Sequence, residues 1–315
     1  MNSKNKKWIM AMLAVLVISA AAAGFTPAWR KTSAIGTGKN CVAEIRIDGT
    51  IYGGPRNGTL FGAPEGVSSE QVMYEMEQAR KDNRVKGVLL RINSPGGSTG
   101  ATQEIAEEMD KIKSAGKPIV VSMGDMCASA GYWLASKGDY VFANPATLTG
   151  SIGVYMDYMN VEELMDKLGV KNEKIKSGVH KDILSMYRPM TGDEQKMLQA
   201  MVDDIYSQFV KTVADGRRLE ESRVRRVADG RILTGQQAME LGLVDAMGNY
   251  YDALNYAGCV AGIEGDSVPV KRYSTGTSWK NILAGEMDSA VRILSKNISD
   301  NVWGALSQTP APSVR

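Results

Sequence analysis

The chain has 315 residues, with 37 Lys and Arg against 35 Asp and Glu, which leaves a net charge of +2. This balance lacks the basic excess of nucleic-acid-binding domains, so we expect no nucleic-acid partner. Three scattered cysteines and a single histidine, His180, predict neither a disulfide framework nor a tetrahedral zinc site. We therefore expect no metal and no cofactor, and a Ser-His-Asp triad is possible only through His180.

The first 25 residues have the pattern of a membrane anchor. Three lysines within the first seven residues precede an uncharged, mostly apolar run over 8–25. As a helix this run would be about 27 Å long, close to the thickness of a bilayer core. We predict a single-pass anchor over 1–25 in the cell membrane, with the rest of the chain on the extracytoplasmic side. The small residues Ala20–Ala23 leave a cleaved signal peptide as the alternative.

The remaining chain divides into three predicted regions. Residues 26–40 are small and polar and are expected to form a linker. Over 41–262, strand and helix patterns alternate without a repeat of fixed period, which predicts a single α/β domain. Residues 263–315 are expected to form a helical extension and a disordered tail. The amphipathic helix of this extension would pack on its own or a neighbouring subunit, or lie on a membrane surface.

Within the α/β domain, local patterns predict the elements in chain order. Residues 41–47 alternate as in a half-buried strand, and Ser68 with Gln71 resembles a capping box that opens a helix. Two further capping boxes are expected at Thr191 with Glu194 and at Thr234 with Gln237. The other expected elements are strands over 85–92, 118–123, 140–142 and 152–156, and helices over 102–114 and from about residue 129.

Two turns after strands contain residues suited to catalysis. Asn93-Ser-Pro-Gly-Gly97 follows a strand, and its glycines permit unusual dihedral angles that could direct the N–H groups of Gly96 and Gly97 into a cleft. An ordinary strand-to-helix turn is the alternative. The second turn lies within 123–133 and leads into a helix that starts near Ser129.

Ser129 is the candidate nucleophile of the second turn. The positive end of the helix dipole would favour its alkoxide, and the N–H of Ala130 would face the same space as an oxyanion donor. Tight packing of a small-residue helix is the alternative reason for this composition. Cys127 is a rival nucleophile, but no basic residue lies near it in sequence, so we expect a buried structural thiol.

A serine nucleophile needs a base, and His180 and Lys181 stand side by side. A lysine base must be neutral near pH 7, which requires its pKa to fall by roughly 3 units from about 10.4. Burial in an apolar pocket can supply such a shift. Sequence spacing alone does not decide between the two neighbours.

Several motifs in order resemble those of the bacterial signal peptide peptidase A family in its short, single-domain form. The resemblance covers about residues 41–250. The motifs are Asn93-Ser-Pro-Gly-Gly97, Ser122-Met-Gly-Asp125, Ala128-Ser-Ala-Gly-Tyr132, Leu148-Thr-Gly-Ser-Ile-Gly-Val154, Lys176-Ser-Gly-Val-His-Lys-Asp182, Asp229-Gly-Arg231 and Thr234–Asp245.

The resemblance implies a ClpP/crotonase-like fold, an α/β superhelix of ββα units, and a serine protease with a Ser-Lys dyad. By position, it implies Ser129 as the nucleophile, Lys181 as the general base and Ser151 as the hydroxyl that orients the lysine. It also implies that Gly96 forms the oxyanion turn with the N–H of Ala130. The family commonly has glycine where this chain has Ala130, which concerns substrate preference.

The family assembles into a homo-oligomer, an octamer, whose active sites are lined by adjoining subunits. The expected function is therefore that of a membrane-anchored serine endopeptidase that degrades cleaved signal peptides and other extended apolar peptides. Two alternatives are a crotonase-like acyl-CoA enzyme and a non-catalytic membrane scaffold of the same fold. The anchor argues against the first, because acyl-CoA chemistry takes place inside the cell.

Overall fold

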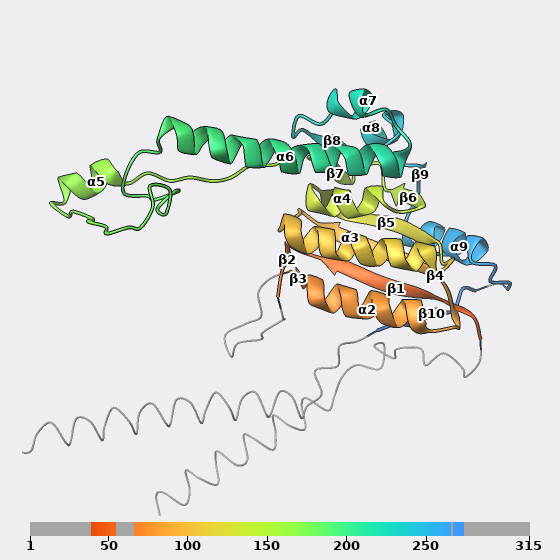
Figure 1. The fold of residues 1–315 in the computed structure, drawn as a ribbon. Coiled ribbons are helices and arrows are strands. Elements are labelled where there is room, and N and C mark those ends of the chain that lie inside the picture. Colours follow the sequence, from red (N-terminus) through yellow and green to blue (C-terminus); the bar gives the residue numbers. More distant parts are fainter. Residues whose placement is uncertain (1–38, 55–65, 266, 274–315) are drawn as a thin grey trace, which may run out of the picture. The chain divides into compact units, whose positions relative to one another are not determined.

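The computed structural model describes residues 39–54, 66–265 and 267–273 (Figure 1). The anchor predicted over 1–25, nearly all of the linker and the part of the extension beyond residue 273 lie outside these ranges. Among the described helices, none is both long enough and apolar enough to cross a bilayer.

A central eight-stranded sheet organises the domain as mixed α/β. Six of its strands form a continuous parallel row. In spatial order they are β10 (Val270–Arg272), β1 (Cys41–Asp48), β4 (Val85–Ser94), β5 (Ile119–Ala128), β6 (Tyr140–Ala143) and β9 (Ala246–Met247). The first five residues of β1 are all buried. The strand expected over 41–47 is confirmed, but the half-buried alternation holds only from Ile45 to Asp48, because helices cover both faces of this parallel sheet.

Along β5 the partner on the side away from β4 changes. β5 pairs with β6 at Val120–Ser122 and with β7 (Leu148–Gly150) at Met126–Ala128. β7 in turn pairs antiparallel with β8 (Ile232–Thr234). Strand structure thus extends to Ala128, and the strand expected over 152–156 is wrong, since the pairing segment ends at Gly150. A separate two-stranded sheet consists of β2 (Ile51–Tyr52) and β3 (Val67–Ser68).

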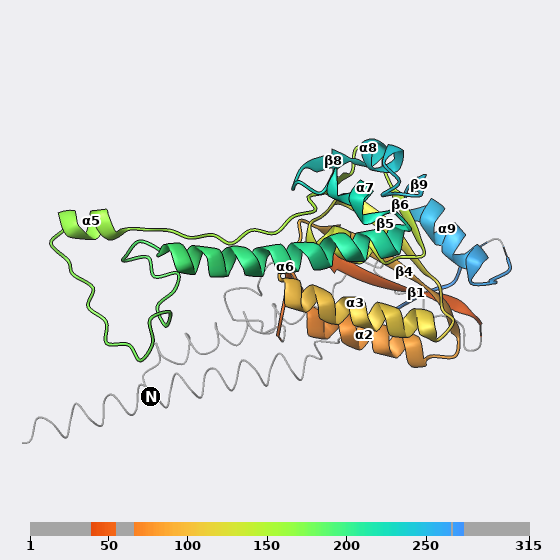
Figure 2. The same ribbon diagram turned by 45° about the horizontal axis from the view of Figure 1, so that its top comes forward.

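Helices pack on both faces of the sheet (Figures 1 and 2). On one side lie α2 (Ser69–Lys81), α3 (Thr99–Ser114) and α4 (Ala130–Ser136). On the other, α9 (Tyr250–Val260) buries Leu254 and Ala257 against Val42, Leu89 and Val120. The capping box expected at Ser68 does not form, because the Ser68 hydroxyl donates to the carbonyl of Gly54 instead.

The longest of the described helices, α6 (Gly192–Arg217), lies in two different environments. The capping box predicted at Thr191 and Glu194 is present at its start. Its later half packs on the domain, where Phe209 stacks on Trp133 of α4 with ring centroids 4.7 Å apart. Its first half continues an arm, defined here as residues 152–201, that extends away from the sheet and includes α5 (Glu162–Lys167) (Figures 1 and 2). Within the arm only Ile152 and Glu194 are buried.

The C-terminal part of the domain contributes to the same sheet. α7 (Glu221–Arg225) and α8 (Gly235–Glu240) follow α6, and the predicted capping box at Thr234 and Gln237 opens α8. β10 pairs with β1 although it lies beyond residue 262. The sheet therefore includes residues of the segment that the sequence assigned to a C-terminal extension.

Candidate active site

The Asn93–Gly97 turn is tied to the neighbouring strand β5. The side chain of Asn93 accepts a hydrogen bond from the N–H of Met126 (3.1 Å). A Cβ at Gly124 would lie 2.9 Å from the Asn93 side chain, so only glycine fits there. These contacts fix the end of β4 against the last residues of β5, the strand that is followed by Ser129.

The two glycines of this turn have different roles in the structure. The N–H of Gly96 donates to Ser94 Oγ (3.1 Å). The N–H of Ile51 donates to the carbonyl of Gly96 (2.9 Å), and the carbonyl of Ile51 accepts from the N–H of Ser98 (2.8 Å). Ile51 thus forms a parallel bridge with Gly97, the residue between these two partners. In parallel pairing the N–H of Gly97 then points away from Ile51. Among the described residues, the N–H of Gly97 has no hydrogen-bond acceptor, whereas the N–H of Gly96 has Ser94 Oγ.

Ser129 follows β5 directly and occupies an unusual backbone conformation. It is the N-cap residue of α4, with φ 53° and ψ −123°, and its hydroxyl makes no capping hydrogen bond. Positive φ is uncommon for residues other than glycine and occurs often at functional sites. The side chain is half-buried. Its hydroxyl is thus not used for helix capping and lies at a sharp strand-to-helix turn.

Gly96 brings the two turns into contact. A Cβ at Gly96 would lie 2.8 Å from Ser129 Cβ, and 3.1 Å from both Ser129 Oγ and Ala130 N. Gly96 also has φ +119°, which favours glycine. Ala130 is the first residue of α4, so its N–H has no partner within the helix. The structure therefore assembles Gly96, Ser129 and Ala130 around one point.

Ser151 is held beside Ser129 by the pairing of β5 with β7. Ala128 and Gly150 are partners in this pairing, and Ser129 N–H donates to the Gly150 carbonyl (2.9 Å). Ser151 follows Gly150, also has positive φ (51°), and is fixed by its N–H bond to the Arg231 carbonyl (2.8 Å). The two serines thus occupy equivalent positions at the ends of neighbouring strands.

Lys181 and His180 are not brought to Ser129 within one chain. Both have exposed side chains in the segment between α5 and α6. His180 Nδ1 lies 3.8 Å from Glu194 Oε1, at the first turn of α6. In the two ribbon views this segment lies at the end of the arm remote from α4 (Figures 1 and 2).

Helix geometry gives the scale of this separation. Phe209 contacts α4, the helix that begins after Ser129, whereas Glu194 lies at the arm end of α6. Fifteen residues separate Glu194 from Phe209, which corresponds to roughly 22 Å along the helix axis. A single chain therefore presents the predicted nucleophile and both candidate bases at different ends of this helix.

Cys127 is fully buried, and burial raises the pKa of its thiol far above the ordinary value. This environment disfavours the thiolate that a cysteine nucleophile requires. The expectation of a buried structural thiol is therefore confirmed.

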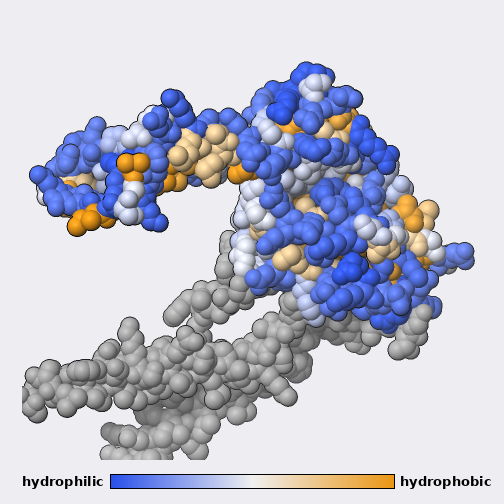
Figure 3. Space-filling view, viewed as in Figure 1, coloured by the Kyte–Doolittle hydropathy of each residue, from blue (hydrophilic) through white to orange (hydrophobic). Residues whose placement is uncertain are grey.

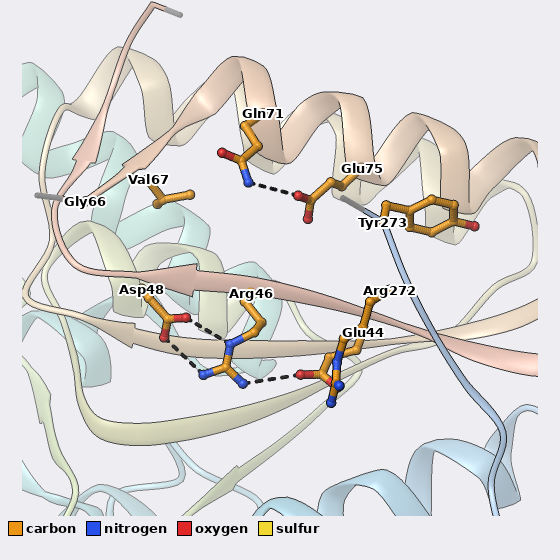
Figure 4. A pocket seen from close by; sticks show the side chains of 9 residues that line it. All are labelled: Glu44, Arg46, Asp48, Gly66, Val67, Gln71, Glu75, Arg272 and Tyr273. Atoms are coloured by element: carbon orange, nitrogen blue, oxygen red, sulfur yellow. Dashed lines mark hydrogen bonds and ion pairs between the residues drawn. The ribbon is translucent and has the colours of Figure 1, made fainter. Parts of the chain in front are cut away.

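A cavity of about 350 Å³ lies away from these residues, at the β1–β10 edge of the sheet (Figure 4). Its charged groups pair with one another: Arg46 lies between Glu44 and Asp48, and Arg272 donates to the buried carboxylate of Glu44. Burial alone would raise the pKa of Glu44, but hydrogen bonds from Arg272 and Tyr250 outweigh it and lower the pKa. None of the predicted site residues lines this cavity.

Some residues that shape the site were not singled out from the sequence. Ser94 accepts a hydrogen bond from the N–H of Gly96. Arg188 forms ion pairs with Asp182, the residue after Lys181, and with Glu194. The sequence motif Asn93–Gly97 includes Ser94, and the predicted capping box includes Glu194, the partner of Arg188. No local pattern reveals the partners, because these hydrogen bonds depend on side-chain orientation.

Comparison with known proteins shows which sequences this chain is similar to. The model of peptidase family S49 matches residues 111–263. The chain is 38% identical over 257 residues to "Putative protease slr0021" of Synechocystis sp., covering 82% of this chain and 87% of that protein. It is 38% identical over 221 residues to "Putative signal peptide peptidase SppA" of Enterococcus faecium, covering 70% of this chain and 63% of the relative.

A third relative, "Protease 4" of Salmonella typhi, is 36% identical over 213 residues. These cover 68% of this chain and only 33% of that protein, so the chain spans about a third of its length. The match to the Synechocystis protein extends over most of both chains. The chain belongs to peptidase family S49, the signal peptide peptidase A family, and is a serine endopeptidase.

Proposed function

We propose that the chain is a membrane-anchored endopeptidase in which Ser129 and Lys181 form a Ser-Lys dyad. The observation that carries this proposal is the contact of Gly96 with Ser129 and Ala130 at two strand ends. A hydroxyl without a capping bond stands there beside an N–H without a helical partner. Such an arrangement suits nucleophilic attack on a carbonyl followed by oxyanion stabilisation.

In the proposed reaction, the uncharged amine of Lys181 accepts the Ser129 proton, and Oγ attacks the peptide carbonyl. Lys181 then passes the proton to the nitrogen of the cleaved peptide bond, and this part of the peptide leaves as an amine while the acyl-enzyme forms. Water then releases the acyl group. The N–H groups of Ala130 and Gly97 stabilise the oxyanion. We assign this role to Gly97 because the N–H of Gly96 is already donated to Ser94. Gly96 instead provides the space for close approach, and Ser151 orients the lysine.

The base is proposed to come from another copy of the chain in a homo-oligomer, octameric by family resemblance. The separation of Lys181 from Ser129 supports this arrangement, as do the apolar patches on the arm (Figure 3). A stable monomer rarely exposes so many large apolar side chains in one region. Those more than half exposed are Tyr155, Met159, Leu164, Leu168, Val170, Ile175 and Val179.

The remaining parts of the proposal concern location, fold and substrate. The lysine-flanked apolar run over 8–25 supports a single-pass anchor with the peptidase on the extracytoplasmic side. The parallel sheet with helices on both faces is compatible with the ClpP/crotonase-like superhelix. Cleaved signal peptides and other apolar peptides are the proposed substrates, supported by the name of the Enterococcus relative. Such peptides would bind extended, adding a strand beside the cleft.

Complementation between two inactive variants tests the dyad. Ser129→Ala and Lys181→Ala chains are co-expressed with different tags, and assemblies that contain both are purified by sequential affinity steps. Each variant alone is expected to be inactive. In random one-to-one assemblies about a quarter of the sites combine an intact serine with an intact lysine, so activity should return to about a quarter of the wild-type value.

Two controls define the outcome. A His180→Ala chain should remain active, and a fluorophosphonate should label Ser129 in the wild type. Inactivity of the mixed assemblies would exclude a base supplied by another copy. Full activity of the Lys181→Ala chain alone, or hydrolysis by the Ser129→Ala chain, would refute the dyad itself.

A further inference from the structure

The residue that follows Lys181 is the most strongly anchored part of its loop. The Asp182 carboxylate accepts hydrogen bonds from Arg188 Nε (3.0 Å) and Nη2 (2.8 Å). Lys176 Nζ donates to the same carboxylate (2.7 Å), and Lys174 Nζ lies 3.9 Å from it. Only 12% of the Asp182 side chain is exposed although the segment around it is largely exposed. The backbone at Lys181 is therefore held through its neighbour.

The same guanidinium binds a second carboxylate at the start of α6. Arg188 Nη1 and Nη2 donate to the two oxygens of Glu194 (2.8 and 2.7 Å). Glu194 is one of the two buried residues of the arm and also closes the capping box with Thr191. A planar guanidinium between two carboxylates forms several directional bonds at once, which fixes orientation as well as distance.

The helix α6 links this ion-pair cluster, defined as Asp182, Arg188 and Glu194, to the domain that holds the serine. Its later half buries Phe209, Val210 and Val213, and Phe209 stacks on Trp133 of α4. A continuous helix is stiff over this length. The packed later half of α6 therefore sets the position of its first turn, where Glu194 lies. Because Arg188 joins Glu194 to Asp182, the ion-pair cluster holds the loop of Lys181 against this first turn.

We propose that Asp182, Arg188 and Glu194 are positioning residues that hold the Lys181 loop on the first turn of α6, so that its amine is presented at a set place to the serine of another copy. The proposal rests on the proposed dyad. In this proposal the three residues act through Lys181 and are assigned no contact with the substrate. Misplacement of a catalytic group by about 1 Å can cost about 10²-fold in rate, which makes such anchoring consequential.

Variants of Arg188 in the full-length protein separate orientation from charge. Arg188→Ala removes the bridge and is expected to lower kcat about 10²-fold with KM changed less than about twofold, because substrate binding is retained. Arg188→Lys keeps the charge without the fork and should restore only part of the rate. Added guanidinium ion at millimolar concentration should partly rescue Arg188→Ala and should leave Lys181→Ala inactive.

Asp182→Asn, which keeps the side-chain shape but removes the charge, should also lower kcat. Arg225→Ala serves as the matched control. Arg225 forms an ion pair with Glu221 on the exposed surface of α7, 3.6 Å apart, and its loss should leave kcat and oligomer size unchanged.

Mixed assemblies show whether the effect belongs to the chain that supplies the lysine. Asp182→Asn is placed either in the Ser129→Ala chain, which supplies Lys181, or in the Lys181→Ala chain, which supplies Ser129. We expect a loss of restored activity of about 10²-fold in the first case and none in the second.

The outcomes distinguish this proposal from the dyad on which it rests. Activity of Lys181→Ala would refute the dyad, whatever the Arg188 variants do. If Lys181→Ala is inactive while Arg188→Ala is as active as Arg225→Ala, the dyad stands and the positioning role is wrong. Equal losses from Asp182→Asn in both chains, or an Arg188→Ala protein that fails to assemble and is not rescued by guanidinium, would also overturn it.

Discussion

The surroundings of Ser129 and those of Lys181 differ in nearly every physical respect. Ser129 lies between buried strands and a buried helix, and its neighbours Gly96 and Ala130 are in contact with it. Lys181 lies in an arm in which only two residues are buried, and ion pairs rather than apolar packing hold its loop. One chain therefore completes the surroundings of Ser129, the proposed nucleophile, by itself and leaves Lys181, the proposed base, exposed.

The largest expected effect comes from filling the space beside Ser129. Gly96→Ala would place a Cβ 2.8 Å from Ser129 Cβ at a positive φ, which displaces Ser129 or Ala130. We expect kcat/KM for a peptide substrate to fall about 10³-fold, as for the loss of an oxyanion donor. Gly100→Ala is the matched control, since a Cβ there meets nothing within 4 Å. Equal activity of the two variants would show that the contact at Gly96 is unimportant for the reaction.

The two halves of α6 should respond differently to truncation. Phe209→Ala removes a buried aromatic ring and its stacking on Trp133, and should lower the free energy of unfolding by about 3–5 kcal/mol. Met201→Ala, in the arm half with its side chain 50% exposed, should cost less than about 0.5 kcal/mol. Urea unfolding of the full chain measures both. A similar cost at the two positions would mean that the arm is packed in solution.

The two capping boxes offer a smaller version of the same comparison. Thr234→Ala in the domain should lower the free energy of unfolding by about 1 kcal/mol. Thr191→Ala in the arm should have less effect on global unfolding and should instead speed amide exchange in the first turns of α6, because ends far from the core open locally. Hydrogen exchange with mass spectrometry separates these responses. Equal exchange in wild type and Thr191→Ala would count against this distinction.

The smallest effect concerns acid stability of the arm. Hydrogen bonds from Arg188 lower the pKa of Glu194 to about 2, below its ordinary value of 4.5. Because the folded state has the lower pKa, this contribution is fully present above pH 4.5 and is lost as the pH falls through 2. Amide protection near the first turn of α6, normalised to the intrinsic exchange rate at each pH, should therefore fall as the pH is lowered from 4.5 to 2. In Glu194→Gln this acid-dependent component should be absent; its persistence would assign it to another carboxylate.

Particular elements show where sequence patterns were sufficient. The helix expected over 102–114 is present as α3, which buries Ile105, Met109 and Ile112, and two capping boxes were located correctly. The pairing of β5 with β7 was not predicted, so the strand expected over 152–156 was wrong. Partner exchange along a strand depends on residues distant in sequence, and local periodicity does not contain that information.

The sequence by itself determined the α/β class, the order of the main elements and the motif positions that identify the peptidase family, because these follow from local periodicity and from residue types at set spacing. Only the tertiary structure decided that Gly96, Ser129 and Ala130 meet, and that the N–H of Gly96 is donated to Ser94. It also placed the loop of Lys181 at the start of α6, where Arg188 binds Asp182, the residue that follows Lys181. Such relations join residues through space, and they depend on how the strands pair and where a long helix is packed.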